Sequence, residues 1–257
     1  MIPTYYEFIK SIMSNSRYIR NEKELAFLDE LMRYALDYVT TIPVGTTYYR
    51  AQIAHNESDY TQGYWNDKEG KEEEDIIGKR IHPCDNERLF PLPNLASEGR
   101  INPKGISYLY LTDNIESGLI EIQASVGEFI TVGKFALTKE VKVIDFTKDA
   151  KRDHIFYFDP SKAPTEHKIK NAWYDINSSF SQAVKRSDNQ ADYIPTQIIS
   201  EYIKLSGYDG VLFTSSKSDG NNLALFDTAS AELVRKKVVN IIGFSCTFED
   251  IPENEPF

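Results

Sequence analysis

The sequence predicts an α+β protein in which a mixed β-sheet of about six to eight strands is flanked by helices. Three observations lead to this class. Apolar residues recur at helical spacing in several segments, short runs rich in β-branched and aromatic residues are typical of strands, and glycine or proline separates the two kinds of segment. At 257 residues the chain is long enough for one large domain or for a domain with a helical appendage.

Residues 1–45 are predicted to form an N-terminal helical segment. A weak helix over Tyr5 to Met13 precedes an amphipathic helix from Asn21 to Thr40, whose apolar residues fall at three- and four-residue steps. Asn21 is a candidate N-cap and Glu24 completes a capping box. Pro43 and Gly45 then end the segment.

Residues 46–248 are predicted to form the main body, which begins with a strand at TTYYRAQI (46–53). Residues 55–98 have little periodicity and include an acidic run at 72–75 and the stretch PLPNL, so we predict a variable loop with at most a short helix. A connection of this length is often a lid or binding loop. The acidic run is expected to be a solvated face rather than a metal site.

The remaining elements alternate between strands and helices. Strands are predicted within 106–112, 127–137, 141–146, 210–215 and 222–226, with one or two more within 233–248. A short helix begins after Asn114 and carries Glu121, a long amphipathic helix covers about 168–185, and another runs from Pro195 to Gly207. Residues 249–257 are expected to be a loose tail.

The composition excludes several classes of function. The net charge is −10, from 29 basic and 39 acidic residues, which argues against direct nucleic-acid binding and requires any anionic ligand to be held by a local basic pocket. The sequence contains neither a membrane-length apolar run nor the pattern of a signal peptide, so we expect a cytoplasmic protein with no membrane contact. Cys84 and Cys246 have no metal-binding spacing and are expected to be ordinary thiols, with no metal site.

The stretch GRINPKGISYLYLT (99–112) combines a turn with a strand. Its turn residues, Asn102 and Gly105 among them, suit a hairpin without any ligand. They equally suit a loop whose backbone N–H groups approach a phosphate, and Arg100 and Lys104 place two cations there. The residues alone leave both interpretations open.

Other side chains are ambiguous in the same way. Arg50 follows two tyrosines in a strand and is either a surface residue or a phosphate clamp. Tyr108 and Tyr110 share one face of a strand, as sheet packing or as a wall for a planar ring. Glu121 follows small and apolar residues and is either solvent-facing or a candidate for chemistry.

Serine chemistry of the hydrolase kind is disfavoured. Ser215 and Ser216 end a strand, where a serine usually acts as a cap. None of the four histidines lies near these stretches, and the sequence has no G-x-S-x-G motif.

Taken in order, five motifs are more specific than any one of them. They are YYRA, GRINPKGISYLYL, LIEI, YIPTQIISEYIKLSGYDGVLFTSS and NNLALF. From Tyr48 to Phe226 the chain resembles the RES domain family, named for an arginine, a glutamate and a serine, whose members include toxins of bacterial toxin–antitoxin pairs. The resemblance implies a split sheet similar to that of ADP-ribosyltransferases and a reaction that cleaves the nicotinamide–ribose bond of NAD, which is then substrate and not cofactor.

The resemblance also assigns site residues. It implies catalytic roles for Arg50, Tyr110, Glu121 and Ser215. The residues expected to bind substrate are Arg100, Asn102, Lys104, Gly105, Tyr108, Ser216 and Asn222. Related long members usually read R-A-R and E-V-R, whereas this chain has Gln52 and Gln123 at the second arginines, which removes two positive charges from the expected pocket.

We therefore expect an NAD glycohydrolase or phosphorylase that acts as a toxin or defence effector. The alternatives are transfer of ADP-ribose to a protein and a non-catalytic module that binds a nucleotide or a partner. The family implies a cognate antitoxin with a helix-turn-helix domain, acting in trans. The N-terminal helices could form a homodimer contact or support the sheet.

Overall fold

The computed structural model describes residues 2–16, 18–148, 163–182 and 190–243. Its helices are α1 (Tyr5–Ser14), α2 (Glu22–Tyr34), α3 (Ile115–Glu121), α4 (Thr165–Ser181) and α5 (Ile194–Leu205), with short 3-10 turns at Ala35–Tyr38, Asn86–Leu89, Gln190–Tyr193 and Thr228–Ser230. Its strands are β1 (Val39–Ile42), β2 (Thr47–Gln52), β3 (His55–Asn66), β4 (Lys71–Pro83), β5 (Leu109–Thr112), β6 (Phe129–Leu137), β7 (Val141–Asp145), β8 (Gly210–Thr214), β9 (Asn221–Leu225) and β10 (Ala231–Asn240).

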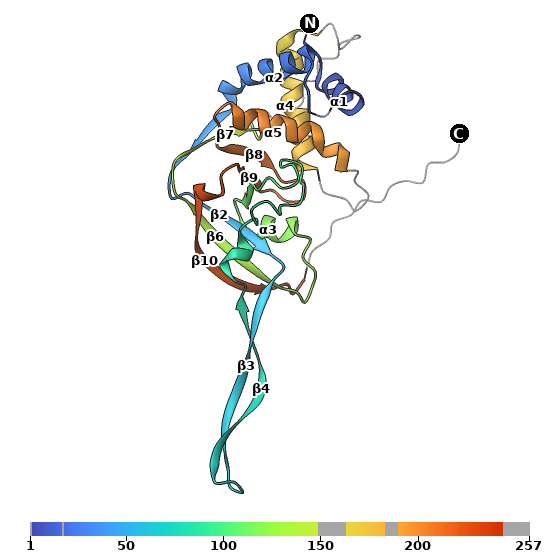
Figure 1. Cartoon of the computed structure of the whole chain (residues 1–257). Helices are drawn as coiled ribbons and strands as arrows, with labels where there is room; N and C mark the ends of the chain where they lie inside the picture. Colours follow the sequence, from blue (N-terminus) through green and yellow to red (C-terminus); the bar gives the residue numbers. More distant parts are fainter. Residues whose placement is uncertain (1, 17, 149–162, 183–189, 244–257) are drawn as a thin grey trace, which may run out of the picture.

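Eight strands form one mixed sheet in the order β1-β7-β8-β9-β5-β2-β6-β10. The β7–β8 pair is parallel and the other pairs are antiparallel. Helices α1, α2, α4 and α5 gather at one end of the molecule, over the half of the sheet that holds β7 and β8 (Figure 1). The predicted α+β class, with a mixed sheet flanked by helices, is confirmed.

The N-terminal prediction is right about where α2 begins and wrong about where it ends. The Asn21 side chain accepts a hydrogen bond from the backbone N–H of Glu24, and the Glu24 carboxylate accepts one from the backbone N–H of Asn21, as the capping box predicts. The helix ends at Tyr34 rather than Thr40. Residues 39–42 are β-branched throughout and pair instead with β7 at the edge of the sheet.

The N-terminal helices share the largest hydrophobic core with the sheet. Phe8 and Phe27 are fully buried and stack with ring centroids 4.6 Å apart. Trp173 of α4 is buried in the same core and stacks on Tyr38 at 4.3 Å. This core also contains Val211 of β8, so α1 and α2 support the sheet.

The segment predicted as a loop is mostly a β-hairpin, which is a correction to the sequence analysis. Strands β3 and β4 pair from His55–Pro83 to Asn66–Lys71, with one bulge next to Tyr60. We call residues 55–83 the arm, because the hairpin stands away from the body as a long ribbon (Figure 1). Nearly all of its residues are exposed on both faces, so the sequence shows no apolar alternation to mark its strands. The short helix allowed within 55–98 is the 3-10 turn Asn86–Leu89.

The other boundaries agree with the predicted elements to within a few residues. The described part of the last predicted strand region, residues 233–243, is occupied by β10, which ends at Asn240. Cys84 is a buried free thiol. Cys246, the tail 249–257 and His154 lie outside the described residues. No helix within the described ranges combines the length and the hydrophobicity that crossing a bilayer requires.

Candidate active site

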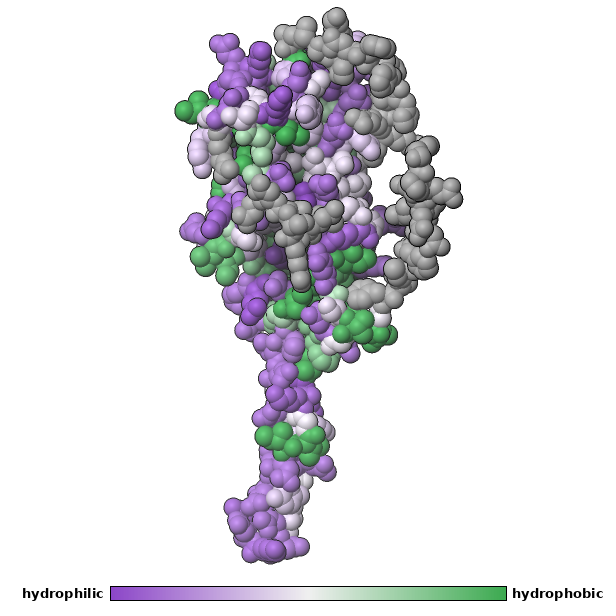
Figure 2. All heavy atoms as spheres, turned by 90° about the vertical axis from the view of Figure 1, so that its right-hand side faces the viewer, coloured by the Kyte–Doolittle hydropathy of each residue, from purple (hydrophilic) through white to green (hydrophobic). Residues whose placement is uncertain are grey.

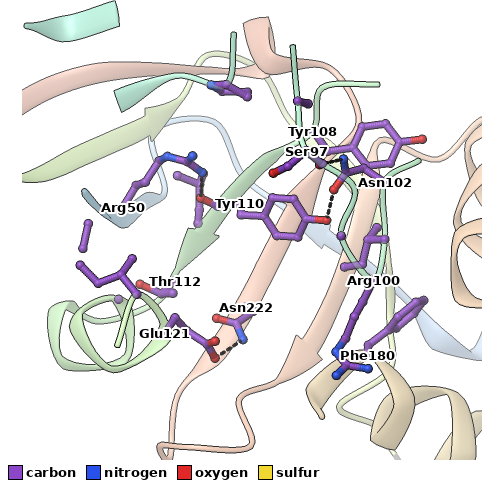
Figure 3. Close-up of a pocket in the computed structure, with 18 of the residues that line it drawn as sticks. Arg50, Ser97, Arg100, Asn102, Tyr108, Tyr110, Thr112, Glu121, Phe180 and Asn222 are labelled. Carbon is purple, nitrogen blue, oxygen red and sulfur yellow. Dashed lines mark hydrogen bonds between the residues drawn. The ribbon is translucent and has the colours of Figure 1, made fainter. Parts of the chain in front are cut away.

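A pocket of about 640 Å³ opens beside the middle strands of the sheet, which is within the usual range for small-molecule sites. Its walls come from β2, from the end of α3, from residues 91–102, from the end of α4 and from β9 (Figure 3). These segments are far apart in the sequence. Of the predicted site residues, the pocket lining includes Arg50, Arg100, Asn102, Tyr108, Tyr110, Glu121 and Asn222.

Arg50 projects from β2 into this pocket (Figure 3). One Nη donates to the backbone carbonyl of Tyr110 at 3.1 Å, while Nε is buried with no hydrogen-bond partner. Burial lowers the pKa of the guanidinium, although an arginine keeps its charge at neutral pH. No carboxylate within the described residues pairs with Arg50, so a largely buried cation is left to be balanced by an anionic ligand.

Glu121 lies at the C-terminal end of α3 and is held by two donors. The Ser215 hydroxyl donates to Oε1 at 2.8 Å, and the Asn222 amide donates to the same oxygen at 3.1 Å. Among the described residues nothing donates to the other carboxylate oxygen. One oxygen is therefore fixed and the other is free for a ligand.

The loop after β8 carries Ser215 to this position. Gly220 lies so close to the start of α3 that a Cβ there would come within 2.2 Å of the Ser117 hydroxyl. The Ser117 and Ser218 hydroxyls lie 2.7 Å apart, and Asp113 accepts from the backbone N–H of Asn221 at 2.9 Å. The loop is thus tied to the helix that carries the glutamate.

Asn102 closes the turn that the sequence analysis singled out. Its amide nitrogen donates to the carbonyls of Ser97, Pro103 and Ile106 at 2.9, 3.2 and 3.1 Å, and its Oδ1 accepts from the Tyr110 hydroxyl at 2.7 Å. The side chain lines the pocket, but these bonds use both of its N–H groups and one acceptor site of Oδ1 in shaping the turn.

Gly99 allows this turn to approach Tyr110. A Cβ at this glycine would lie 2.8 Å from Asn102 Oδ1 and 3.2 Å from the Tyr110 hydroxyl. The Gly99 carbonyl in turn accepts from the Gln197 side chain of α5 at 2.8 Å. The glycine is needed for close packing here, and its backbone is anchored to the helical layer.

The two tyrosines of the turn and strand do share a face, and they differ in surroundings. Leu109 and Leu111 pack in a second core on the opposite face of the sheet. Tyr108 is 2% exposed, and burial raises its pKa to about 12. The Tyr110 ring lies across the middle of the pocket (Figure 3), and burial raises its pKa further, so its hydroxyl stays neutral and donates to Asn102.

Several predicted residues lie apart from the pocket wall. Lys104 and Ser216 are exposed and do not line it, and Gly105, at φ +85°, serves the turn by donating to the Ala96 carbonyl at 2.8 Å. Ser215 does not line the pocket and contacts it only through its hydrogen bond to Glu121. Arg100 lines the pocket near the end of α4, and its guanidinium stacks on the Tyr193 ring at 4.8 Å.

Lys217 and the end of α4 are parts of the pocket wall that the sequence did not reveal. Lys217 lines the pocket and makes no ion pair within the described residues, so it adds a third cation to the wall after Arg50 and Arg100. Phe180, Ser181 and Gln182 close the far side. The only sign in the sequence is that Lys217 lies in the polar loop SKSDGN. Its position in the pocket wall depends on the tertiary fold.

Gln52 and Gln123 both line the pocket, at the ends of β2 and α3. Gln123 adopts a left-handed backbone with φ +54° two residues beyond Glu121. The two neutral amides therefore lie where the resemblance would place arginines, and Arg50, Arg100 and Lys217 are the basic residues of the wall.

The geometry combines a cation without a carboxylate partner, an aromatic ring and a fixed carboxylate in one pocket. Such a site can bind an anionic ligand that carries a ring and can place a negative charge beside a centre that becomes positive. The carboxylate needs no histidine to do so.

Comparison with known proteins gives three results. No curated protein sequence matches this chain significantly. A solved structure with a partly similar fold, the M. tuberculosis MbcT-MbcA toxin-antitoxin complex, aligns with a TM-score of 0.44 and 12% identity over 82% of this chain and 93% of that chain. The model of the RES domain matches residues 79–249, which is well over half of the sequence and includes the turn, Glu121, Ser215 and Asn222. The YYRA motif with Arg50 lies before the matched residues. The family indicated by the motifs is confirmed, and the chain belongs to the RES domain family.

Proposed function

We propose that this protein is an enzyme that consumes NAD by cleaving the bond between nicotinamide and ribose, and that it acts as a toxin. The observation that carries the proposal is that Arg50 and Glu121 line the same pocket. Arg50 is a largely buried cation with no carboxylate partner in the described residues, and Glu121 is a carboxylate with only one oxygen held by hydrogen bonds. A dinucleotide has a pyrophosphate that can bind Arg50 and a ribose that can bind the free oxygen of Glu121.

The carboxylate supplies the electrostatic part of the reaction. Departure of nicotinamide leaves an oxocarbenium-like ribose, and a negative group near the anomeric carbon stabilises that positive charge. Nicotinamide already carries a positive charge in NAD and leaves without protonation, so a single carboxylate suffices. Ser215 and Asn222 hold one oxygen of Glu121, and the other is available to the ribose.

The cations and the tyrosine orient the substrate. Arg50 presents a planar fork of donors suited to two phosphate oxygens, and Lys217 adds a point charge on the neighbouring wall. Tyr110, whose hydroxyl is tied to Asn102, presents its ring to the nicotinamide end of the substrate. Water, inorganic phosphate or a protein side chain then serves as acceptor, which distinguishes glycohydrolase, phosphorylase and transferase.

Membership of the RES domain family supports the toxin role, and with it a cognate antitoxin that blocks the pocket in trans. The antitoxin expected from the resemblance is a small protein with a helix-turn-helix domain. An adjacent reading frame encoding such a protein would agree with this part of the proposal.

The decisive experiment follows nicotinamide release from NAD by NMR, with and without inorganic phosphate. We expect free nicotinamide together with ADP-ribose, or with its phosphorylated form when phosphate is present. The matched control is Glu121→Gln, which keeps the shape and the acceptor for Ser215 and Asn222 but removes the charge. Loss of that charge should lower the turnover number at least about 100-fold.

Three outcomes would redirect the proposal. Isotope from NAD on a protein band would identify an ADP-ribosyltransferase. Tight binding of NAD without turnover would identify a binding module. Equal nicotinamide release by the wild type and by Glu121→Gln would contradict the mechanism.

A further inference from the structure

The arm exposes large apolar side chains along a ribbon that has no core of its own. They are Tyr60, Tyr64, Trp65, Ile76 and Ile77, all at least 42% exposed. Figure 2 shows an apolar patch partway along the otherwise hydrophilic arm. A two-stranded hairpin is marginally stable in water, and an exposed apolar patch on such an element is typical of an interaction surface.

One face near the end of the arm carries both apolar and acidic side chains. Trp65 lies directly opposite Glu72 in the register, and Glu74 follows two residues later on the same face. Neither Glu72 nor Glu74 makes an ion pair within the described ranges, whereas Glu73, on the other face, is paired with Lys71. The arm therefore presents two unpaired carboxylates about 7 Å apart beside a tryptophan.

The outer edge of β10 has the complementary charge. Strand β10 is the last of the sheet and pairs only with β6 in the described part of the chain. The register places Arg235 opposite Lys134, and Lys237 follows two residues later on the same face. None of these three cations pairs with a carboxylate among the residues described, although the chain as a whole carries a net charge of −10.

We propose that the arm of one molecule docks along β10 of a second copy, with Glu72 and Glu74 facing Arg235 and Lys237. In both strands the charged residues are two apart on one face, so the spacing of the carboxylates matches that of the cations. Trp65 and Ile76 then cover the apolar part of the edge, where Val234 is 50% exposed.

The dimensions allow the contact to occur twice. The 12 residues of β3 extend about 40 Å and the 10 residues of β10 about 34 Å, so the arm can run the length of the strand. Every copy carries both surfaces, so the proposed dimer has a two-fold axis that places each arm on the other molecule's edge. The same contact covers the outer edge of β10, which pairs with no second strand in the described part of the chain.

The test is a charge exchange between two double variants, read by light scattering after gel filtration at low ionic strength. The wild type should have twice the chain mass. Glu72→Lys with Glu74→Lys, and Arg235→Glu with Lys237→Glu, should each raise the dissociation constant of the dimer at least about ten-fold. An equimolar mixture of the two should restore a dimer, because each restores the opposite charge to the other.

The matched control is Glu22→Lys with Glu140→Lys, which makes the same change of charge at exposed positions away from both surfaces and should leave the dimer intact. Unchanged circular dichroism would show that the variants fold, and none of the changed residues lines the pocket. A wild type that is monomeric at all concentrations would overturn the proposal. So would a dimer that persists in both charge-reversal variants, or a mixture that stays monomeric.

Discussion

Arg50 is the residue whose surroundings say most about the ligand. It lies in β2, contacts the Tyr110 carbonyl, and has no acidic partner among the described residues. A charge in this position costs stability in the free protein unless something else compensates it. This loss of stability is explained if an anionic substrate neutralises the charge of Arg50 when it binds.

Arg50→Ala should therefore weaken binding without weakening the fold. A charge-assisted hydrogen bond contributes about 1.5–3 kcal/mol, so the dissociation constant for NAD should rise about 10- to 100-fold. The free energy of unfolding should stay the same or increase, because an unpaired buried charge is removed. Calorimetric titration in the Glu121→Gln background measures the first quantity without turnover, and urea denaturation measures the second.

Arg50→Lys is the matched control, since it keeps the charge but loses the planar fork. Its dissociation constant should lie between those of the wild type and the alanine variant. An alanine variant that binds NAD as tightly as the wild type would contradict the phosphate-clamp role of Arg50.

At the level of single residues, sequence motifs located much of the candidate site. Arg50, Tyr110 and Glu121 were singled out by residue type and order, and all three line the pocket. Lys217 could not be found in this way, because a lysine in a polar loop is usually exposed. Its place in the wall depends on how closely Gly220 packs against α3, which no local pattern shows.

Among the elements, the turn over residues 97–106 is the part most sensitive to a small change. Asn102 holds three of its carbonyls, and Gly99 leaves just enough room for the Asn102 and Tyr110 side chains. The turn and the ring that crosses the pocket are thus packed as one unit.

Gly99→Ala should disturb that unit. The new Cβ would meet Asn102 Oδ1 at 2.8 Å, and overpacking of this kind costs about 1–3 kcal/mol. Urea denaturation should show a loss in this range together with weaker NAD binding. Gly78→Ala in the arm is the control, because nothing lies within 4 Å of its Cβ and its stability should change little. Equal stabilities of the two variants would contradict this account of the turn.

Helices and strands differed in how well they could be predicted. The α2 capping box is a local device and was recognised from Asn21 and Glu24. The arm was not predicted because both of its faces are exposed to solvent. Its strands therefore lack the apolar alternation by which a half-buried strand is recognised. Strand β1 was hidden for a different reason, since four β-branched residues directly follow a helix.

On the scale of the whole molecule, the N-terminal helices are part of the main core rather than an appendage resting on it. Phe27 of α2 is fully buried in the cluster that also holds residues of α4, α5 and β8. Sequence periodicity showed that α2 has an apolar face. It could not show what that face covers.

Phe27→Ala should consequently destabilise the entire protein by about 3–5 kcal/mol. The unfolding transition should remain a single one, with circular dichroism and pocket-dependent NAD binding lost together. Tyr18→Ala is the control, because that ring is 89% exposed and its removal should change the stability little. A variant that loses only helical signal at low denaturant, while the sheet unfolds as before, would show that residues 1–45 form a separate unit.

The order of strands in the sheet has a consequence for the time at which the site appears during synthesis. Strand β9, made late, lies between β8 and β5, and it brings Asn222 to a glutamate made a hundred residues earlier. Ser215 reaches the same oxygen from the same late part of the chain. A ribosome must therefore release most of the polypeptide before Glu121 acquires its two donors, and a product of interrupted translation carries this carboxylate without the groups that hold it in place.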